Sequence, residues 1–103
     1  MRIIKEKTLR LYMSQRRYSP ARISLEAWIY LVRYSYWKSP AELKIRLRTV
    51  RIISSSRAVF NIKGNQYRLV VDINYRHQVV DIIWFGTHEE YDNVDVMKVR
   101  YGD

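Results

Sequence analysis

Three apolar stretches rich in β-branched residues, joined by two short turns, occupy most of the second half of this 103-residue chain. The first runs from Ala58 to Lys63, the second from Gln66 to Asn74, and the third ends at Phe85. Runs of this length and composition, bounded by glycine and small polar residues, are typical of β-strands. The sequence therefore predicts a meander of antiparallel strands.

The turn between the first two runs determines how they pair. Gly64-Asn65 suits a two-residue loop, because glycine readily adopts positive φ at the first central position. Counting outward from that loop places apolar residues opposite apolar residues and one basic residue opposite an acidic one, so the register is self-consistent. The predicted pairs are Ile62 with Tyr67, Asn61 with Arg68, Phe60 with Leu69, Val59 with Val70, and Arg57 with Asp72.

The second turn, near Tyr75 to Gln78, is less well defined. A loop of two or four residues there would bring the end of the third run back to the tip of the first hairpin, close to Lys63, Asn65 and Arg68. His88 lies three positions after the end of this run. The corresponding pairs are Val71 with Ile82 and Leu69 with Trp84, with Gly86 beside Tyr67.

The first half of the chain predicts an edge strand and helices. Arg2 to Ile4 is short and β-branched, and a helix is expected from Lys5 to about Ser14. Ser19-Pro20 predicts a second helix, with serine as the cap and proline at the first helical position. Ser39 with Glu42 forms a capping box for a short third helix that ends near Leu47. The expected apolar stripes are Leu9, Tyr12 and Met13 in the first helix and Leu25, Trp28, Leu31 and Val32 in the second.

The expected fold is α+β, a small antiparallel sheet centred on Val59 to Phe85 with two or three helices on one face. At this length, one domain spanning residues 1–103 is expected. An apolar content of 48% predicts a packed core rather than disorder. The core is expected to include Trp28, Phe60, Leu69, Val71 and Ile82. Residues Val96 to Tyr101 fit either a last short strand or a docked tail.

The net charge of +9 is unevenly distributed along the chain. Up to His88 there are 17 basic and 5 acidic residues, whereas from Glu89 onward there are 2 basic and 5 acidic. A basic body with an acidic end indicates a polyanionic partner, nucleic acid above all, although a charge excess that only aids solubility has the same composition.

Composition also narrows the cellular setting. Cysteine is absent, which excludes disulfides and thiolate nucleophiles and suits the reducing cytoplasm. No apolar run reaches transmembrane length, and the start of the chain is too charged for a signal peptide. We therefore expect a cytoplasmic protein that does not contact the membrane.

Two groups of surface candidates admit two interpretations each. Tyr30, Tyr34 and Tyr36 can stack on bases, but we expect them to pack at the rim of the core, because aromatic area mostly serves burial. Four basic residues nearly alternate with apolar ones after the third helix begins. They form either a solvated face or a ridge that follows RNA phosphates. These four residues are Lys44, Arg46, Arg48 and Arg51.

The polar cluster from Thr87 to Asp92 has the residues best suited to chemistry. RNA is cleaved without a metal when its 2′-OH attacks the adjacent phosphorus, provided that a base, an acid and cations assist. His88 suits acid–base work because imidazole titrates near neutral pH. Tyr91 lies one helical turn further on, where it can protonate the leaving oxygen or stack on a base.

Residues beside the first turn complete the candidate site. Lys63 and Arg68 can clamp a phosphate, and Asn61 can orient Arg68. Purely structural roles are the alternative for each, and a lone histidine at a strand end often only makes structural hydrogen bonds. His77 is expected to be exposed. The single histidine of the cluster lacks H-E-x-x-H spacing, and no glycine-rich phosphate loop is present, so neither a catalytic metal nor a small-molecule cofactor is expected.

The pattern F-N-I-K-G-N-x-Y-R-L-V-V-x-I-N-Y, followed by F-G-T-H-x-E-Y-D, resembles the HigB family of bacterial toxins. The segments RIIKEKTLR and WKSPAELK are also similar to that family. The resemblance implies a RelE-like fold and a HigA-type antitoxin as partner. It also implies cleavage of mRNA, which in this family usually takes place on the translating ribosome. It also places His88 and Tyr91 in the active site. The alternatives are a non-catalytic RNA-binding protein and a decayed toxin that only binds its antitoxin.

Overall fold

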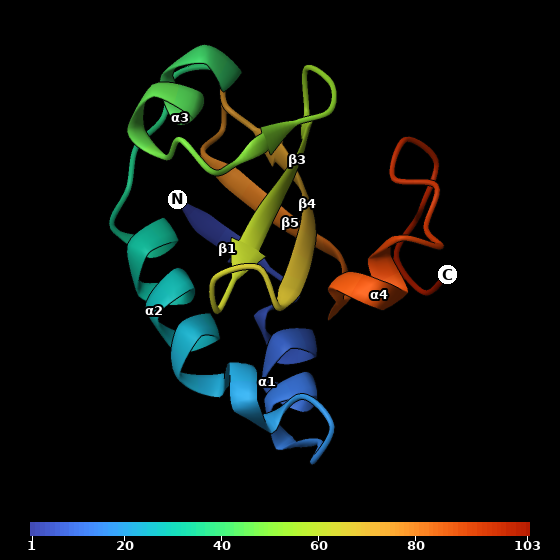
Figure 1. Cartoon of the computed structure of the whole chain (residues 1–103). Coiled ribbons are helices and arrows are strands. Elements are labelled where there is room, and N and C mark those ends of the chain that lie inside the picture. Colours follow the sequence, from blue (N-terminus) through green and yellow to red (C-terminus); the bar gives the residue numbers. More distant parts are fainter.

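A computed structural model describes the whole chain, residues 1–103 (Figure 1). It confirms the α+β class: five strands form one sheet in the order β1-β5-β4-β3-β2, and helices pack against it. The elements in chain order are β1 (Arg2–Ile4), α1 (Glu6–Ser14), the 3₁₀ turn η1 (Ser19–Ala21), α2 (Arg22–Arg33), α3 (Pro40–Arg46), β2 (Arg51–Ile52), β3 (Arg57–Ile62), β4 (Tyr67–Asn74), β5 (Val79–Thr87) and α4 (His88–Tyr91).

The hairpin of β3 and β4 has the predicted register at every pair, from Ile62 opposite Tyr67 to Arg57 opposite Asp72. Gly64 adopts the expected positive φ, at 62°. Lys63 also has positive φ, at 53°, which the sequence did not indicate. Because the pairing is antiparallel and in phase, Asn61 and Arg68 lie on the same face of the sheet.

The hairpin of β4 and β5 departs from the predicted register halfway along. Val71 lies opposite Ile82 as expected, but Val70 lies opposite Trp84, so Ile83 has no partner and forms a β-bulge. Beyond this point the predicted pairs are wrong by one residue, because the extra residue shifts every later position. Leu69 therefore faces Phe85 rather than Trp84, and Gly86 faces Arg68 rather than Tyr67.

Strand β1 is the edge strand that the sequence predicts, but it runs parallel to β5, with Ile3 opposite Val80. The sheet is therefore mixed rather than wholly antiparallel. A parallel neighbour requires a long connection, and the helices and the other strands supply it.

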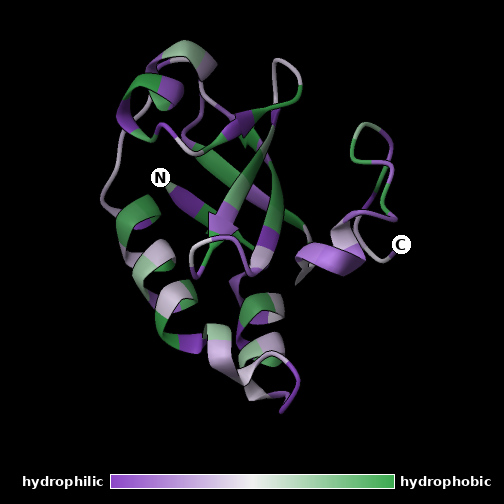
Figure 2. Ribbon diagram, in the orientation of Figure 1, coloured by the Kyte–Doolittle hydropathy of each residue, from purple (hydrophilic) through white to green (hydrophobic).

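The larger core lies between the sheet and the helices α1, α2 and α3. All five residues predicted for it are buried, and so is Phe85, whose ring meets those of Tyr12, Tyr18 and Tyr67. The strands are accordingly among the most hydrophobic parts of the ribbon, whereas α4 is hydrophilic (Figure 2). None of the helices is both long and apolar enough to cross a membrane.

Two predictions about α2 are wrong. Ser19 does not cap it, because Ser19–Ala21 forms a 3₁₀ turn without a side-chain cap and α2 begins at Arg22. Leu31 is 41% exposed, and Ile29 is buried in its place, because the core face is centred on Leu25 and Val32.

The predicted packing of Tyr30, Tyr34 and Tyr36 at the rim of the core is also wrong. These rings are 68%, 72% and 63% exposed. Tyr30 and Tyr34 lie on the side of α2 that faces away from the sheet, and Tyr36 follows in the connection to α3. Burial therefore does not account for them.

The opposite face of the sheet is partly covered by the chain that follows α4. Val99 packs there against Val59, Val70 and Ile83. Arg57 holds this segment in place, since its guanidinium pairs with Asp72 at 2.9 Å and donates to the carbonyls of Val96 and Val99. Of the two structures expected for residues 96–101, the docked tail is the one observed, because no strand forms there.

Candidate active site

Helix α4 begins at the end of β5 with a capping box. The Thr87 hydroxyl accepts a hydrogen bond from the Glu90 N–H at 3.1 Å, and Glu90 Oε1 accepts one from the Thr87 N–H at 2.8 Å. Such caps contribute about 1 kcal/mol to helix stability. The sequence shows this motif as T-x-x-E, but we did not predict it. It determines where His88 and Tyr91 point.

Glu90 also connects α4 to the helical layer. Its carboxylate accepts a hydrogen bond from the Tyr18 hydroxyl and pairs with the Arg17 guanidinium at 3.0 Å. Burial raises the pKa of Glu90, but the hydrogen bonds from Thr87 and Tyr18 and the charge of Arg17 outweigh it and lower the pKa. The negative charge of Glu90 is therefore stabilised in the folded protein.

Gly86 makes this arrangement possible through the close approach of its neighbours. A Cβ atom there would lie 2.6 Å from the Trp84 ring and 2.9 Å from Glu90 Oε1. Both distances are shorter than van der Waals contact. Any larger residue would therefore have to displace the Trp84 ring, the Glu90 carboxylate, or both.

His88 lies beside the tip of the first hairpin, as the sequence predicts. Its backbone N–H donates to the Gln66 carbonyl at 3.0 Å. Its side chain is 49% exposed, and Nε2 contacts the Glu89 carboxylate. The imidazole is therefore accessible and has one acidic neighbour, Glu89.

Tyr91 meets two arginines on the face of the sheet opposite the large core. Arg51 Nη1 donates to the Tyr91 hydroxyl at 3.2 Å, and the Arg68 guanidinium lies 6.0 Å from the ring centroid. The ring packs near Trp84, with centroids 6.1 Å apart. A phenol and two cations thus share one surface, one helical turn from His88.

The other predicted residues lie around the same hairpin tip. Arg68 Nη1 donates to the carbonyls of Asn65 and Tyr67, which fixes its position. Asn61, the cross-strand partner of Arg68, donates to the Asn65 side chain at 3.3 Å and makes no hydrogen bond to Arg68 itself. Lys63 is exposed in the turn and has no ion pair.

The predicted basic ridge does not form one line. Lys44 Nζ donates to the carbonyls of Arg48 and Val50, at 2.8 and 2.6 Å, and so closes the exit from α3. Arg46 lines a concavity elsewhere, beside Tyr34 and Tyr36, and the Arg48 side chain is exposed. Only Arg51 reaches the surface around Tyr91, so the structure moves it from the ridge into the candidate site.

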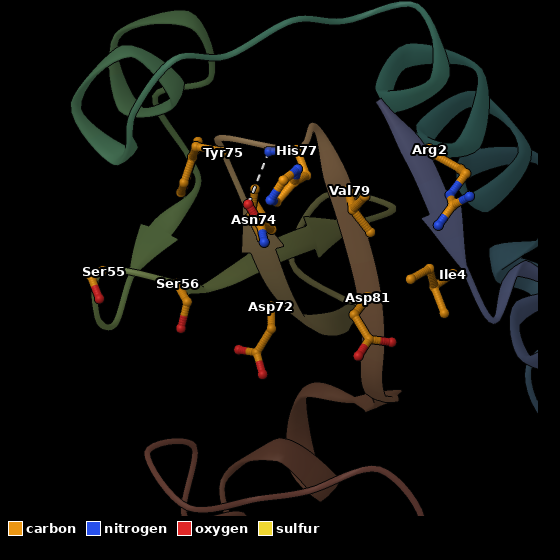
Figure 3. Close-up of a pocket in the computed structure, with 11 residues that line it drawn as sticks. Arg2, Ile4, Ser55, Ser56, Asp72, Asn74, Tyr75, His77, Val79 and Asp81 are labelled. Carbon is orange, nitrogen blue, oxygen red and sulfur yellow. Dashed lines mark hydrogen bonds between the residues drawn. The ribbon is translucent and has the colours of Figure 1, made fainter.

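A cavity of about 1000 Å³ lies elsewhere on the sheet, at the end of β4 and the start of β5 (Figure 3). None of the predicted site residues lines it. Asp72 and Asp81 face each other there, but Arg57 and Lys5 pair with them. His77, exposed as predicted, is nearby.

No three His, Cys, Asp or Glu side chains in the chain gather closely enough to hold a metal ion together.

Residues 21–94 match the sequence profile of a RelE-like toxic component of a toxin-antitoxin system. That profile defines the HigB toxin family, and this chain belongs to it. The matched range contains every residue of the candidate site, from Arg51 to Tyr91. Membership implies an antitoxin partner. The search of curated proteins found no match.

Proposed function

We propose that this toxin is an endoribonuclease that cleaves mRNA on the ribosome in the cytoplasm, and that a HigA-type antitoxin restrains it. The single observation that carries the proposal is the gathering of His88, Tyr91, Arg51 and Arg68 at one end of the sheet. These groups can supply acid–base chemistry and positive charge without a metal.

The hydrogen bonding of Tyr91 suits a donor to the leaving oxygen. Its hydroxyl oxygen accepts from Arg51, which leaves its own hydrogen free to donate. In the proposed reaction His88 takes the proton of the 2′-OH, the 2′-oxygen attacks phosphorus, and the bond to the 5′-oxygen breaks. Tyr91 protonates that oxygen. The products are a 2′,3′-cyclic phosphate and a 5′-hydroxyl.

The cations suit a phosphate that gains negative charge. Arg51 and Arg68 have no carboxylate partner within 4.0 Å, so their charge is available to a bound anion. Arg68 is held by two carbonyls, which reduces the entropy lost when it binds phosphate. Lys63, in the adjacent turn, adds a third positive charge to the proposed clamp.

The proposal is tested with purified protein, a defined mRNA, and the same mRNA on programmed ribosomes. Cleavage that persists in EDTA and yields 2′,3′-cyclic ends supports it. On the free mRNA, cleavage that stops in EDTA and returns with a divalent ion contradicts the metal-free mechanism; the ribosome itself needs Mg²⁺, so it is left out of this comparison. A protein that binds RNA but leaves it intact supports the non-catalytic alternative, which the unpaired arginines also favour.

A further inference from the structure

Helix α2 is apolar on two opposite sides. Its inner side is buried against the sheet through Leu25, Trp28, Ile29 and Val32. Its outer side has a second apolar row at spacings of four, three and four, which places the row on one face. We call it the outer stripe, and it consists of Ile23, Ala27, Tyr30 and Tyr34. A helix that only covers a core is normally polar on its outer side.

The outer stripe is exposed and continues beyond α2. Ile23 is 76% exposed, and the rings of Tyr30 and Tyr34 contact each other with centroids 4.8 Å apart. Beside Tyr34 is a concavity of about 400 Å³ that leads toward α3 and is lined by both apolar and polar groups. Its lining includes Leu31, Tyr36, Trp37, Arg46 and Leu47. Exposed apolar rows such as the outer stripe, bordered by polar groups, mark interaction sites.

We propose that the outer stripe and the adjoining concavity bind an acidic, amphipathic helix of the antitoxin. The inference rests on the toxin–antitoxin role stated above, and it assigns a place on the toxin to that partner. An amphipathic helix would lay its apolar face along the stripe, and Tyr30 and Tyr34 would be the principal anchors.

The charges around the stripe favour an acidic partner. Arg22, at the start of α2, Lys38, and Arg46, in the concavity, have no carboxylate within 4.0 Å. A second copy of this chain is disfavoured as the occupant, because each copy carries a net charge of +9 and would bring the same basic groups to the interface.

RNA is also disfavoured on this surface. Ile23 and Ala27 make up half of the stripe, and aliphatic side chains offer no stacking surface for bases. Tyr30 and Tyr34 already contact each other, and the basic groups flank the row rather than alternate with it. This pattern is complementary to a partner helix that has an apolar face flanked by acidic residues.

The position of the stripe has a consequence for inhibition. Helix α2 covers the large core, whereas Tyr91 and Arg51 lie on the opposite face of the sheet, and α2 and α4 lie on opposite sides in Figure 1. A helix bound to the outer stripe would leave His88 uncovered. The antitoxin would then restrain the toxin by its bulk, or through other parts of its chain.

The test uses the full-length protein and the antitoxin encoded by the neighbouring reading frame, with affinity measured by calorimetry. The double variant Tyr30→Glu, Tyr34→Glu should bind roughly 30-fold or more weakly, which is the effect of losing a central anchor. Arg46→Glu should also weaken binding. Leu11→Glu on α1, a residue 56% exposed, is the matched control and should bind like the wild type.

Circular dichroism and thermal melting establish that each variant is folded. Hydrogen exchange of the wild-type complex provides a measurement without substitutions, and α2 should be protected. Equal affinity of the double variant and no protection of α2 would overturn the inference. Two other results would also overturn it. One is that the free protein dimerises in ultracentrifugation and that Tyr30→Glu abolishes the dimer. The other is that the double variant loses binding to a single-stranded oligonucleotide while its affinity for the antitoxin is unchanged. RNA cleavage is a separate readout, so its absence would contradict the nuclease proposal alone.

Discussion

The hydroxyl of Tyr18 lies 3.1 Å from both carboxylate oxygens of Glu90, a residue 72 positions later in the chain. Tyr18 is packed into the large core, whereas Glu90 is followed directly by Tyr91, which packs on the other face of the sheet. Helix α4 therefore spans the end of the sheet and is held from both sides. The candidate site depends on this support.

Replacing His88 with alanine should reduce RNA cleavage by about 10²–10⁴-fold, the usual effect of losing a positioned acid or base. Tyr91→Phe should reduce it less, because the ring and its packing remain. Cleavage rates on a defined RNA measure both effects. His77→Ala is the matched control, since His77 is exposed and distant in the sheet, and it should cleave like the wild type. Full activity in a folded His88→Ala protein would remove His88 from the mechanism.

Arg51→Gln and Arg68→Gln should each weaken RNA binding. Each should also reduce the slope of the logarithm of the binding constant against the logarithm of the salt concentration, by about one per lost phosphate contact. Binding measured between low and moderate salt gives that slope. The control is Arg48→Gln, because Arg48 is exposed and its side chain lies outside the site. If Arg48→Gln lowers the slope as much as Arg51→Gln does, the assignment of Arg51 to the site is wrong.

The lowered pKa of Glu90 predicts how stability changes with pH. Its ordinary value is 4.5, and the folded value is below this, so the ionised form favours folding. This contribution is present above about pH 4.5 and is lost as the pH falls through the folded pKa. Denaturant unfolding at several pH values should show the loss, and Glu90→Gln should show less of it. Glu89→Gln, on the exposed neighbour, should retain the wild-type profile.

Substitution of Gly86 by alanine should lower the free energy of unfolding by about 1–3 kcal/mol, because the new Cβ would overlap Trp84 and Glu90. The cost should be smaller when Trp84 is also replaced by leucine, and a double-mutant cycle measures that coupling. Gly64→Ala is the comparison. Its cost comes from a φ of 62° with no atom within 4 Å, so it should not couple to Trp84.

The first hairpin was predictable because its pairing follows from local information. Gly64-Asn65 determines the turn, and alternation then determines each pair down to Arg57 with Asp72. The neighbourhood of His88 followed from the same reasoning, since a strand of known direction returns to a known turn. These features need only counting along the chain.

The remaining features depend on contacts that counting does not reveal. Glu90 meets Tyr18 and Arg17 only because the helical layer lies beside the end of β5. The exposure of Tyr30 and Tyr34 follows from which side of α2 faces the sheet, and both sides are apolar in the sequence. Arg51 enters the site through the pairing of β2 with β3, and β2 has only two residues.

The unpaired Ile83 determines which residues of β5 reach each side of the sheet. Before it, Val80 and Ile82 alternate into the large core, and strict alternation would also send Trp84 there. The bulge instead directs Phe85 into that core and leaves Trp84 near Tyr91. Relatives of this toxin can therefore be compared with it residue by residue beyond this point only if they keep the extra position. In a relative without it, the residue aligned with Gly86 would occupy the opposite side of the strand.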